Sequence, residues 1–319
     1  MGKGKFYVAL KKRFMELFPR LAYWRVKRIC YRSNAVINDL SVKKGVSIDY
    51  RSDGLYPTMF AKPPSHYASL NAARQYDAKG IPHKDSVYNP VSVIQYGLAE
   101  YGYYHTTRAE EHLERARAVC DWLLENQDAK TGCWYYQSDF HHKGTGDTLH
   151  SPWASAMAQG EGISLLMRVY GITKQEKYLK VARSALEMLE VPVSDGGLCA
   201  EFDGYKVYEE YPTDTPSFTL NGTLFCSFGL FDYAKLTGDE YVYKMWESQV
   251  DAVERMLPLY DDDVCSSYDL SYHTAGLIGK NQNEKYHLIH IALLQNLQSI
   301  APRTTFEHYI RKWAKITGH

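Results

Sequence analysis

The stretch at residues 218–238, FTLNGTLFCSFGLFDYAKLTG, is apolar on nearly every side of a helix and rich in small residues. A helix that is apolar all round has no stripe for water, so it must be buried among other elements. Three more stretches share this pattern: PVSVIQYGLAEYGYY at 90–104, SAMAQGEGISLLMRVYG at 155–171 and KYHLIHIALLQNLQSI at 285–300. We expect each of the four to form an inner helix.

Each apolar stretch is followed, after a short turn, by a stretch with charge on one face. These expected outer helices cover residues 112–126, 178–189, 242–257 and 306–316. The repeat has a period of about 62 to 69 residues, measured between Gln95, Gln159, Asn221 and His290. Alternating inner and outer helices at such a period predict a mainly α fold, an (α/α)4 barrel or toroid.

Segments with strand character separate the helix pairs. They lie at 131–153, 196–212 and 264–273, and Asp203-Gly204 between two aromatic runs is a hairpin signal. Because all three occupy the same place in the repeat, we expect short β-hairpins at one mouth of the barrel. A cleft would be built there.

The charges divide the chain into two units. Lysine plus arginine and aspartate plus glutamate both number 37, which gives no reason to expect nucleic acid as a partner. Residues 1–32, however, carry ten basic residues and one acid. We predict a basic N-terminal arm and irregular wrapping segment at 1–85, including a short N-terminal extension, and a barrel at 86–319.

The basic arm begins with an amphipathic pattern at residues 5–18. Such a helix can lie on an anionic membrane surface or dock on its own domain, and the second reading is the commoner one. A basic track would also attract a polyanionic substrate toward the cleft.

The six cysteines show no CxxC and no histidine-paired spacing. This pattern predicts free thiols in a reducing compartment and no metal. No signal-peptide segment and no apolar run of bilayer length is present, so the expected location is cytoplasmic, with a location peripheral to the inner membrane face left open.

Residues 205–222, YKVYEEYPTDTPSFTLNG, join a hairpin strand to a buried helix and place Glu210 beside Tyr211. Pro212 has no amide hydrogen and biases Tyr211 toward extended geometry, at a strand end where side chains commonly face a cleft. Acid/base chemistry is plausible there, although most Glu-Tyr pairs in a chain this rich in both are structural.

Four motifs in order resemble the catalytic C-terminal domain of the glucuronyl C5-epimerases. The motifs are YNPVSVIQYGLAEY, SPWASAMAQGEGISLLMRVY, EEYPTDTPSFTLNGTLFCSFGLFDY, and SSYDL followed by KYHLIH, and the resemblance runs from about Tyr88 to Ile300. These enzymes convert D-glucuronate to L-iduronate within heparosan or heparan chains. The resemblance implies an isomerase on an (α/α)4 barrel with no nicotinamide, flavin or other cofactor.

The same resemblance places the family's acid/base and substrate residues on Glu210, Tyr211, Tyr268 and Tyr286. One departure is clear: Ser271 and the tyrosine after it stand where the family has an arginine and a histidine after YDL. Nearby candidates for the missing cation are His273, Lys280 and Lys285.

Epimerisation at C5 removes a proton alpha to a carboxylate and returns it on the opposite face, so two groups must flank the ring. We predict Glu210 and Tyr286 as this pair, with Tyr211 and Tyr268 orienting or stabilising. The predicted substrate-binding residues are Tyr88, Gln95, Trp153, Gln159, Asn221, His273, Lys285, His287 and His290. Histidines on an apolar inner helix are, however, more often satisfied core groups.

The expected partner is an anionic glucuronate-containing polysaccharide. A peripheral contact with a membrane-bound polymer assembly and a homodimer are compatible with the sequence. The alternatives are a uronate polysaccharide lyase, a glycoside hydrolase on the same toroid, or a non-catalytic glycan-binding protein.

Two weaker motifs remain. Asp139, His141, His142 and His150 could suggest a metal, but their polar, glycine-rich run is more typical of a solvated loop. Trp134, Tyr135, Tyr136 and Trp153 could stack on sugars or belong to the core.

Overall fold

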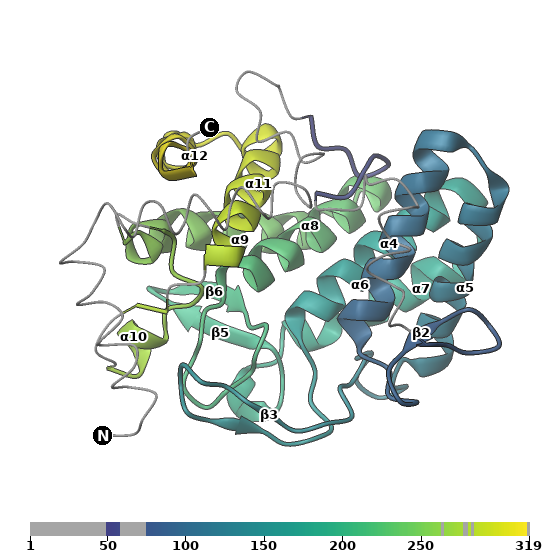
Figure 1. Ribbon diagram of the computed structural model, residues 1–319, viewed down its shortest axis with the longest axis horizontal. Coiled ribbons are helices and arrows are strands. Elements are labelled where there is room, and N and C mark those ends of the chain that lie inside the picture. Colours follow the sequence, from purple (N-terminus) through teal and green to yellow (C-terminus); the bar gives the residue numbers. More distant parts are fainter. Residues whose placement is uncertain (1–48, 58–74, 263–264, 277–279, 282–283, 318–319) are drawn as a thin grey trace.

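The computed structural model describes residues 49–57, 75–262, 265–276, 280–281 and 284–317. The predicted basic arm lies outside these residues. The described helices include four consecutive pairs: α4 (Pro90–Thr107) with α5 (Glu110–Asn126), α6 (Ala156–Thr173) with α7 (Glu176–Ser184), α8 (Leu220–Thr237) with α9 (Glu240–Tyr260), and α11 (Glu284–Ile300) with α12 (Thr304–Thr317). The predicted pairing of helices is therefore present (Figure 1).

The first helix of each pair is an inner helix. In α8 every residue from Leu220 to Ala234 is buried, and α6 is buried from Ala156 to Val169. The outer helix α5 instead buries one stripe, which includes Leu113, Ala116, Val119, Cys120 and Leu123. Burial thus follows the two patterns in the sequence, uniform for inner helices and one-sided for outer helices.

The outer helix α7 is shorter than predicted. It ends at Ser184, and a 3₁₀ turn at Glu187–Leu189 replaces the last turn of the expected helix at 178–189. The apolar spacing continues through the turn, because Leu186 and Leu189 are buried. Periodicity alone could not locate the end of the α-helical hydrogen bonding.

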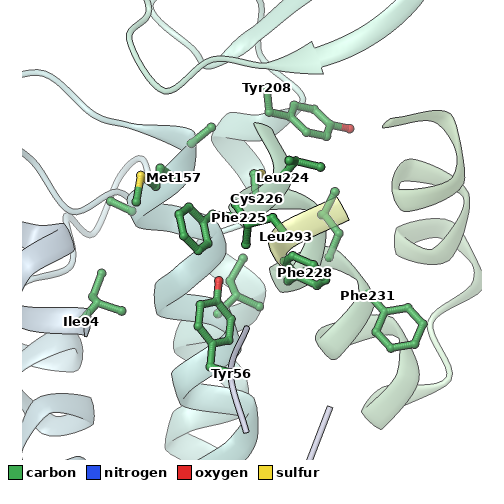
Figure 2. Packing of buried hydrophobic residues seen from close by; sticks show 14 of the residues in the cluster. Tyr56, Ile94, Met157, Tyr208, Leu224, Phe225, Cys226, Phe228, Phe231 and Leu293 are labelled. Atoms are coloured by element: carbon green, nitrogen blue, oxygen red, sulfur yellow. The ribbon is translucent and has the colours of Figure 1, made fainter. Parts of the chain in front are cut away.

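Helices α6 and α8 meet at glycines. A Cβ on Gly160 would lie 2.4 Å from the Cα of Cys226, and one on Gly229 would lie 2.3 Å from the backbone oxygen of Gly160. The two backbones are therefore in direct contact. Phe225 and Phe228 of α8 pack in the buried cluster beside this crossing, together with Tyr56 (Figure 2).

Residues 50–56 connect the C-terminal ends of the inner helices. The Tyr50 hydroxyl donates to Asp232 of α8 at 2.8 Å, and the Tyr50 amide donates to Ser299 Oγ of α11 at 3.0 Å. Arg168 of α6 forms a fully buried ion pair with Asp232 and donates to the Gly54 carbonyl at 3.1 Å. This segment of the predicted wrapping region thus belongs to the barrel core.

Short hairpins lie on the opposite side of the helices from residues 49–57 (Figure 1). The pairs are β1 (Gln75–Tyr76) with β2 (Pro82–His83), β3 (Phe140–His141) with β4 (Thr148–Leu149), and β5 (Cys199–Phe202) with β6 (Tyr205–Tyr208). Asp203 and Gly204 turn the last hairpin with φ of 49° and 82°, as the Asp-Gly signal predicts. The third excursion differs, because its described residues contain the short helix α10 (Ser271–Thr274).

The close contact of α6 and α8 at Gly160 and Gly229 predicts that one added methyl group there lowers the stability of the fold. Gly160→Ala should lower the free energy of unfolding by about 1–3 kcal/mol, because the new Cβ meets backbone that cannot move aside. Gly171→Ala on the same helix is the matched control, since its Cβ would lie 3.8 Å from Leu236 Cδ2. Denaturant titration should show no loss of unfolding free energy for Gly171→Ala. Equal losses in the two variants would show that the contact at Gly160 is not unusually close.

The buried ion pair between Arg168 and Asp232 predicts that the stability losses on replacing the two residues do not add. Arg168→Leu should destabilise the protein by about 3–5 kcal/mol, because it leaves the Asp232 carboxylate without its buried cation. Adding Asp232→Leu should recover part of this loss. Unfolding free energies that simply add would show that the pair is not coupled.

Candidate active site

Glu209 anchors the loop between β6 and α8. Its buried carboxylate accepts hydrogen bonds from Ser217 Oγ at 2.9 Å and from the Phe218 amide at 3.0 Å. Phe218 has φ of 46°, a left-handed conformation that the Glu209 bonds hold in place. Burial raises the pKa of Glu209 to about 7. The side chain of Glu209 is thus occupied in fixing the loop.

The side chain of Glu210 instead lies against the first turn of α8. Asn221 Nδ2 donates to its Oε2 at 3.3 Å. Gly222 makes room for this carboxyl group, because a Cβ there would lie 2.4 Å from both Cβ and Oε2 of Glu210. Burial, reinforced by the charge of Glu209, raises the pKa of Glu210 to about 8, while hydrogen bonds from Tyr211 and Asn221 oppose the shift.

Three tyrosines gather beside Glu210. The Tyr211 and Tyr268 hydroxyls are 3.3 Å apart, and the rings of Tyr268 and Tyr286 have centroids 4.6 Å apart. Burial and the nearby charge of Glu210 raise the pKa of all three phenols above the ordinary value. Each phenol is therefore neutral and able to donate a hydrogen bond near pH 7.

A cleft of about 370 Å³ opens above these groups. Its walls come from the N-terminal turns of the inner helices and from the first two excursions; they include Gln95, Phe140, Trp153, Met157, Glu210, Tyr211, Asn221, Phe225 and Tyr286. Tyr211 stacks on Phe140 with centroids 4.8 Å apart. The Oδ1 of Asn221 is buried and has no hydrogen-bond partner among the described residues.

The structure brings most predicted site residues together. Gln95, Trp153 and Asn221 line the cleft with Glu210, Tyr211 and Tyr286, and Tyr268 contacts both of these tyrosines. Tyr88 lies in a neighbouring hollow. His273 is exposed on α10, and the side chain of Lys285 lies outside the described part of the chain.

Three residues predicted to bind substrate have structural roles instead. Gln159 accepts from the Trp134 amide at 3.1 Å and donates to the carbonyls of Gly132 and Ala185 at 3.0 Å. His287 Nδ1 accepts from the Ser266 amide at 2.8 Å, and His290 Nδ1 lies 2.7 Å from Ser266 Oγ.

Both histidines are fully buried and lie near Trp313 of α12, with ring centroids 6.0 and 6.5 Å away. Burial lowers the pKa of His287 to about 4 and that of His290 well below its usual range. Their placement corresponds to the core alternative, and it follows from their side of α11, which faces α12.

Glu161 was not singled out from the sequence, and His142 was assigned to a solvated loop. Glu161 of α6 is fully buried, accepts hydrogen bonds from Gln95 at 3.2 and 3.3 Å, and has a pKa raised well above the ordinary value by burial. His142 is buried with its ring 5.1 Å from Tyr211, so the interpretation of its run as a solvated loop is wrong at that position. A carboxylate inside an otherwise apolar helix was the available signal for Glu161.

Of the predicted substitutes for the missing arginine, His273 and Lys280 do not line the cleft. The lining residues include no lysine or arginine. Lys280 donates instead to the Asp261 carbonyl. Among the described residues, no group of three or more histidine, cysteine, aspartate or glutamate side chains could hold a metal ion.

The sequence matches the family described as "D-glucuronyl C5-epimerase C-terminus" over residues 127–315, more than half of the chain. The chain belongs to this family. It is 34% identical over 220 residues to a D-glucuronyl C5-epimerase of Caenorhabditis elegans, which covers 65% of this chain but only 36% of that protein. An uncharacterized protein of Methanocaldococcus jannaschii is 25% identical over 64% of this chain and 68% of its own length.

Solved structures confirm the fold prediction. The cellobiose 2-epimerase of Spirochaeta thermophila superposes with a TM-score of 0.58 at 12% identity, covering 95% of this chain and 86% of that one. A GH76 α-mannanase of Bacteroides thetaiotaomicron superposes with a TM-score of 0.52 at 12% identity, covering 92% of this chain and 82% of that one.

None of the described helices is both long and apolar enough to cross a membrane.

The raised pKa of Glu210 predicts that this residue destabilises the folded protein at high pH. Between its unfolded value near 4.5 and about 8, the folded state keeps a proton that the unfolded state releases, so stability falls as pH rises. Glu210→Gln should therefore gain stability over the parent protein, with a gain that grows from pH 5 to about pH 8 and then levels off. Glu201→Gln, on the exposed face of β5, is the control; a Glu210→Gln gain independent of pH would contradict the shifted pKa.

Proposed function

We propose that the protein is a glucuronyl C5-epimerase that converts D-glucuronate to L-iduronate residues in a heparosan-like glycosaminoglycan or exopolysaccharide. The observation that carries this proposal is the buried Glu210, whose pKa of about 8 sits beside three neutral phenols in an open cleft. Membership of the epimerase family and the 34% identity to the C. elegans enzyme support the same reaction.

The reaction needs one group that takes the C5 proton and another that returns a proton on the other face. A carboxyl group with a pKa of about 8 is matched to this task near neutral pH, because it loses and regains a proton at little cost. In our proposal ionised Glu210 takes the proton in one direction while the Tyr286 phenol supplies one from the opposite face. The reverse reaction exchanges these roles.

The intermediate is an enediolate, whose negative charge must be stabilised. Tyr211 and Tyr268 are neutral donors beside Glu210, and Asn221 adds polar atoms to the wall. Met157, Asn221 and Tyr286 lie in the first turns of α6, α8 and α11, so the positive ends of three helix dipoles face the cleft. Among the described residues, these dipoles and donors are the groups placed to stabilise the charge of the enediolate.

The direct test follows hydrogen exchange at C5. The protein, incubated in deuterated water with de-N-acetylated, N-sulfated heparosan, should place deuterium at C5 of the uronate. Glu210→Gln should lower this rate by about 10²–10⁴, the usual contribution of a general acid or base, while Glu201→Gln on the exposed face of β5 should leave it unchanged. New ultraviolet absorbance from an unsaturated uronate would indicate a lyase instead, and new reducing ends without it would indicate a hydrolase.

The pKa values also predict the pH dependence of epimerisation. The active form has Glu210 ionised and Tyr286 protonated, so kcat/KM should rise as the pH approaches about 8 and stay high until a phenol ionises. Replacing Asn221 by Ala removes a hydrogen bond that favours the carboxylate, so the rise should move to higher pH. A profile that is flat between pH 6 and 9 would exclude Glu210 as the titrating group.

A further inference from the structure

A second hollow lies beside the cleft, and we call it the aromatic pocket. Its volume is about 320 Å³, and four of its lining residues are aromatic: Tyr88, Trp122, Trp134 and Tyr135. The rings of Tyr88 and Trp122 have centroids 5.7 Å apart. Trp122 and Trp134 are buried beneath the pocket, while Tyr88 and Tyr135 are partly exposed. The flat apolar faces of these two tyrosine rings suit the C–H face of a pyranose ring.

The aromatic pocket shares its wall with the cleft. Tyr135 and Gln137 line the pocket, whereas Tyr136 and Ser138, their neighbours in the chain, line the cleft. This alternation is that of an extended segment, whose successive side chains point to opposite sides. A polymer lying in the cleft can therefore reach the pocket by passing over one segment of backbone.

Hydrogen bonds fix the two tyrosine rings of the pocket. The Tyr88 hydroxyl donates to Asp77 Oδ2 at 2.9 Å, and the Tyr135 hydroxyl donates to Thr131 Oγ1 at 3.0 Å. Because its hydroxyl is hydrogen-bonded, each tyrosine ring is fixed in orientation before a ligand binds. Binding to such faces costs little side-chain entropy.

The rim of the pocket contains a strained turn. Asp85 and Ser86 have φ of 50° and 63°, between Lys84 and Val87, whose backbones exchange hydrogen bonds of 3.0 and 2.8 Å. A turn with positive φ at both central residues is usually formed by Asn-Gly, whereas here it is formed by Asp-Ser. The turn holds Val87 at the pocket rim with 47% of its surface exposed. Backbone strain and an exposed apolar side chain at one place are typical of a binding rim.

The charges at the pocket disfavour an anion. Asp128 Oδ1 accepts hydrogen bonds from the amides of Lys130 and Thr131 at 3.0 and 2.9 Å, and these bonds lower the pKa of Asp128. Its carboxylate is ionised, and the lining residues include no lysine or arginine. A uronate would be repelled there, whereas an uncharged sugar would not.

We propose that the aromatic pocket is a subsite for an uncharged sugar unit, such as an N-acetylated hexosamine, of the same polymer whose glucuronate lies in the cleft. The identity of the polymer rests on the proposed function. The subsite holds the chain beyond the reacting residue, so it contributes to the binding of long substrates and leaves the chemical step unchanged.

The test measures KM against chain length on partially N-sulfated heparosan that retains N-acetylated, uncharged hexosamines, from a tetrasaccharide to the full polymer. For the parent protein KM should fall by about tenfold once the chain is long enough to enter the pocket, equivalent to about 1.4 kcal/mol. Tyr135→Ala should abolish this fall with kcat unchanged, while Tyr135→Phe, which keeps the ring, should retain most of it. Val87→Gln places a longer side chain at an exposed rim position and should act like Tyr135→Ala without affecting folding.

Tyr243→Ala is the matched control, since Tyr243 is an exposed tyrosine near the start of α9, at the other end of the barrel. Tryptophan fluorescence gives a second readout, because Trp122 and Trp134 line the pocket. A neutral N-acetylglucosamine tetramer should change the emission of the parent protein but not of Val87→Gln. No fluorescence change, together with the same length dependence in all variants, would overturn the subsite. Absence of C5 exchange at every chain length would instead contradict the proposed function, and the fluorescence titration would still decide the subsite.

Discussion

The direct backbone contact between α6 and α8 is the constraint on which the site depends. Gly160 and Gly229 let the two helices approach until only glycine fits between them. This crossing sets the position of the first turn of α8, where Asn221 bonds Glu210 and Gly222 leaves space for its carboxyl group. A wider spacing would separate Asn221 and Glu210 from Met157 on the facing wall of the cleft. Small residues in the inner helices thus serve both packing and chemistry.

The buried carboxyl groups at the two ends of the barrel have different partners. At the end where residues 50–56 lie, the Asp232 carboxylate has Arg168 as a counter-charge and Tyr50 as a donor. At the mouth, Glu210 and Glu161 are buried among described residues that give them amide or phenol partners and no cation. Their raised pKa values reduce stability at high pH, which is the cost of an acid/base group that titrates near neutrality.

The helix pairs and the core of the site could be predicted because their signals are local. Uniformly apolar stretches fix the inner helices, and Glu210 with Tyr211 stands next to a proline at a strand end. The sequence could not show which way a polar residue on an inner helix points. Gln159 caps backbone groups, His287 faces α12, and Glu161 faces Gln95, although all three interrupt similar apolar patterns. Only the packing of neighbouring elements distinguishes these positions.

If Glu210 and Tyr286 act from opposite faces of the sugar ring, early isotope incorporation reveals it. In deuterated water, the deuterium content at C5 of both epimers is measured by NMR before a tenth of the substrate has reacted. Deuterium should appear in the newly formed iduronate ahead of the remaining glucuronate, because the returned proton comes from a different group than the one that took it. Iduronate that keeps its original hydrogen would indicate a single acid/base group and contradict the account.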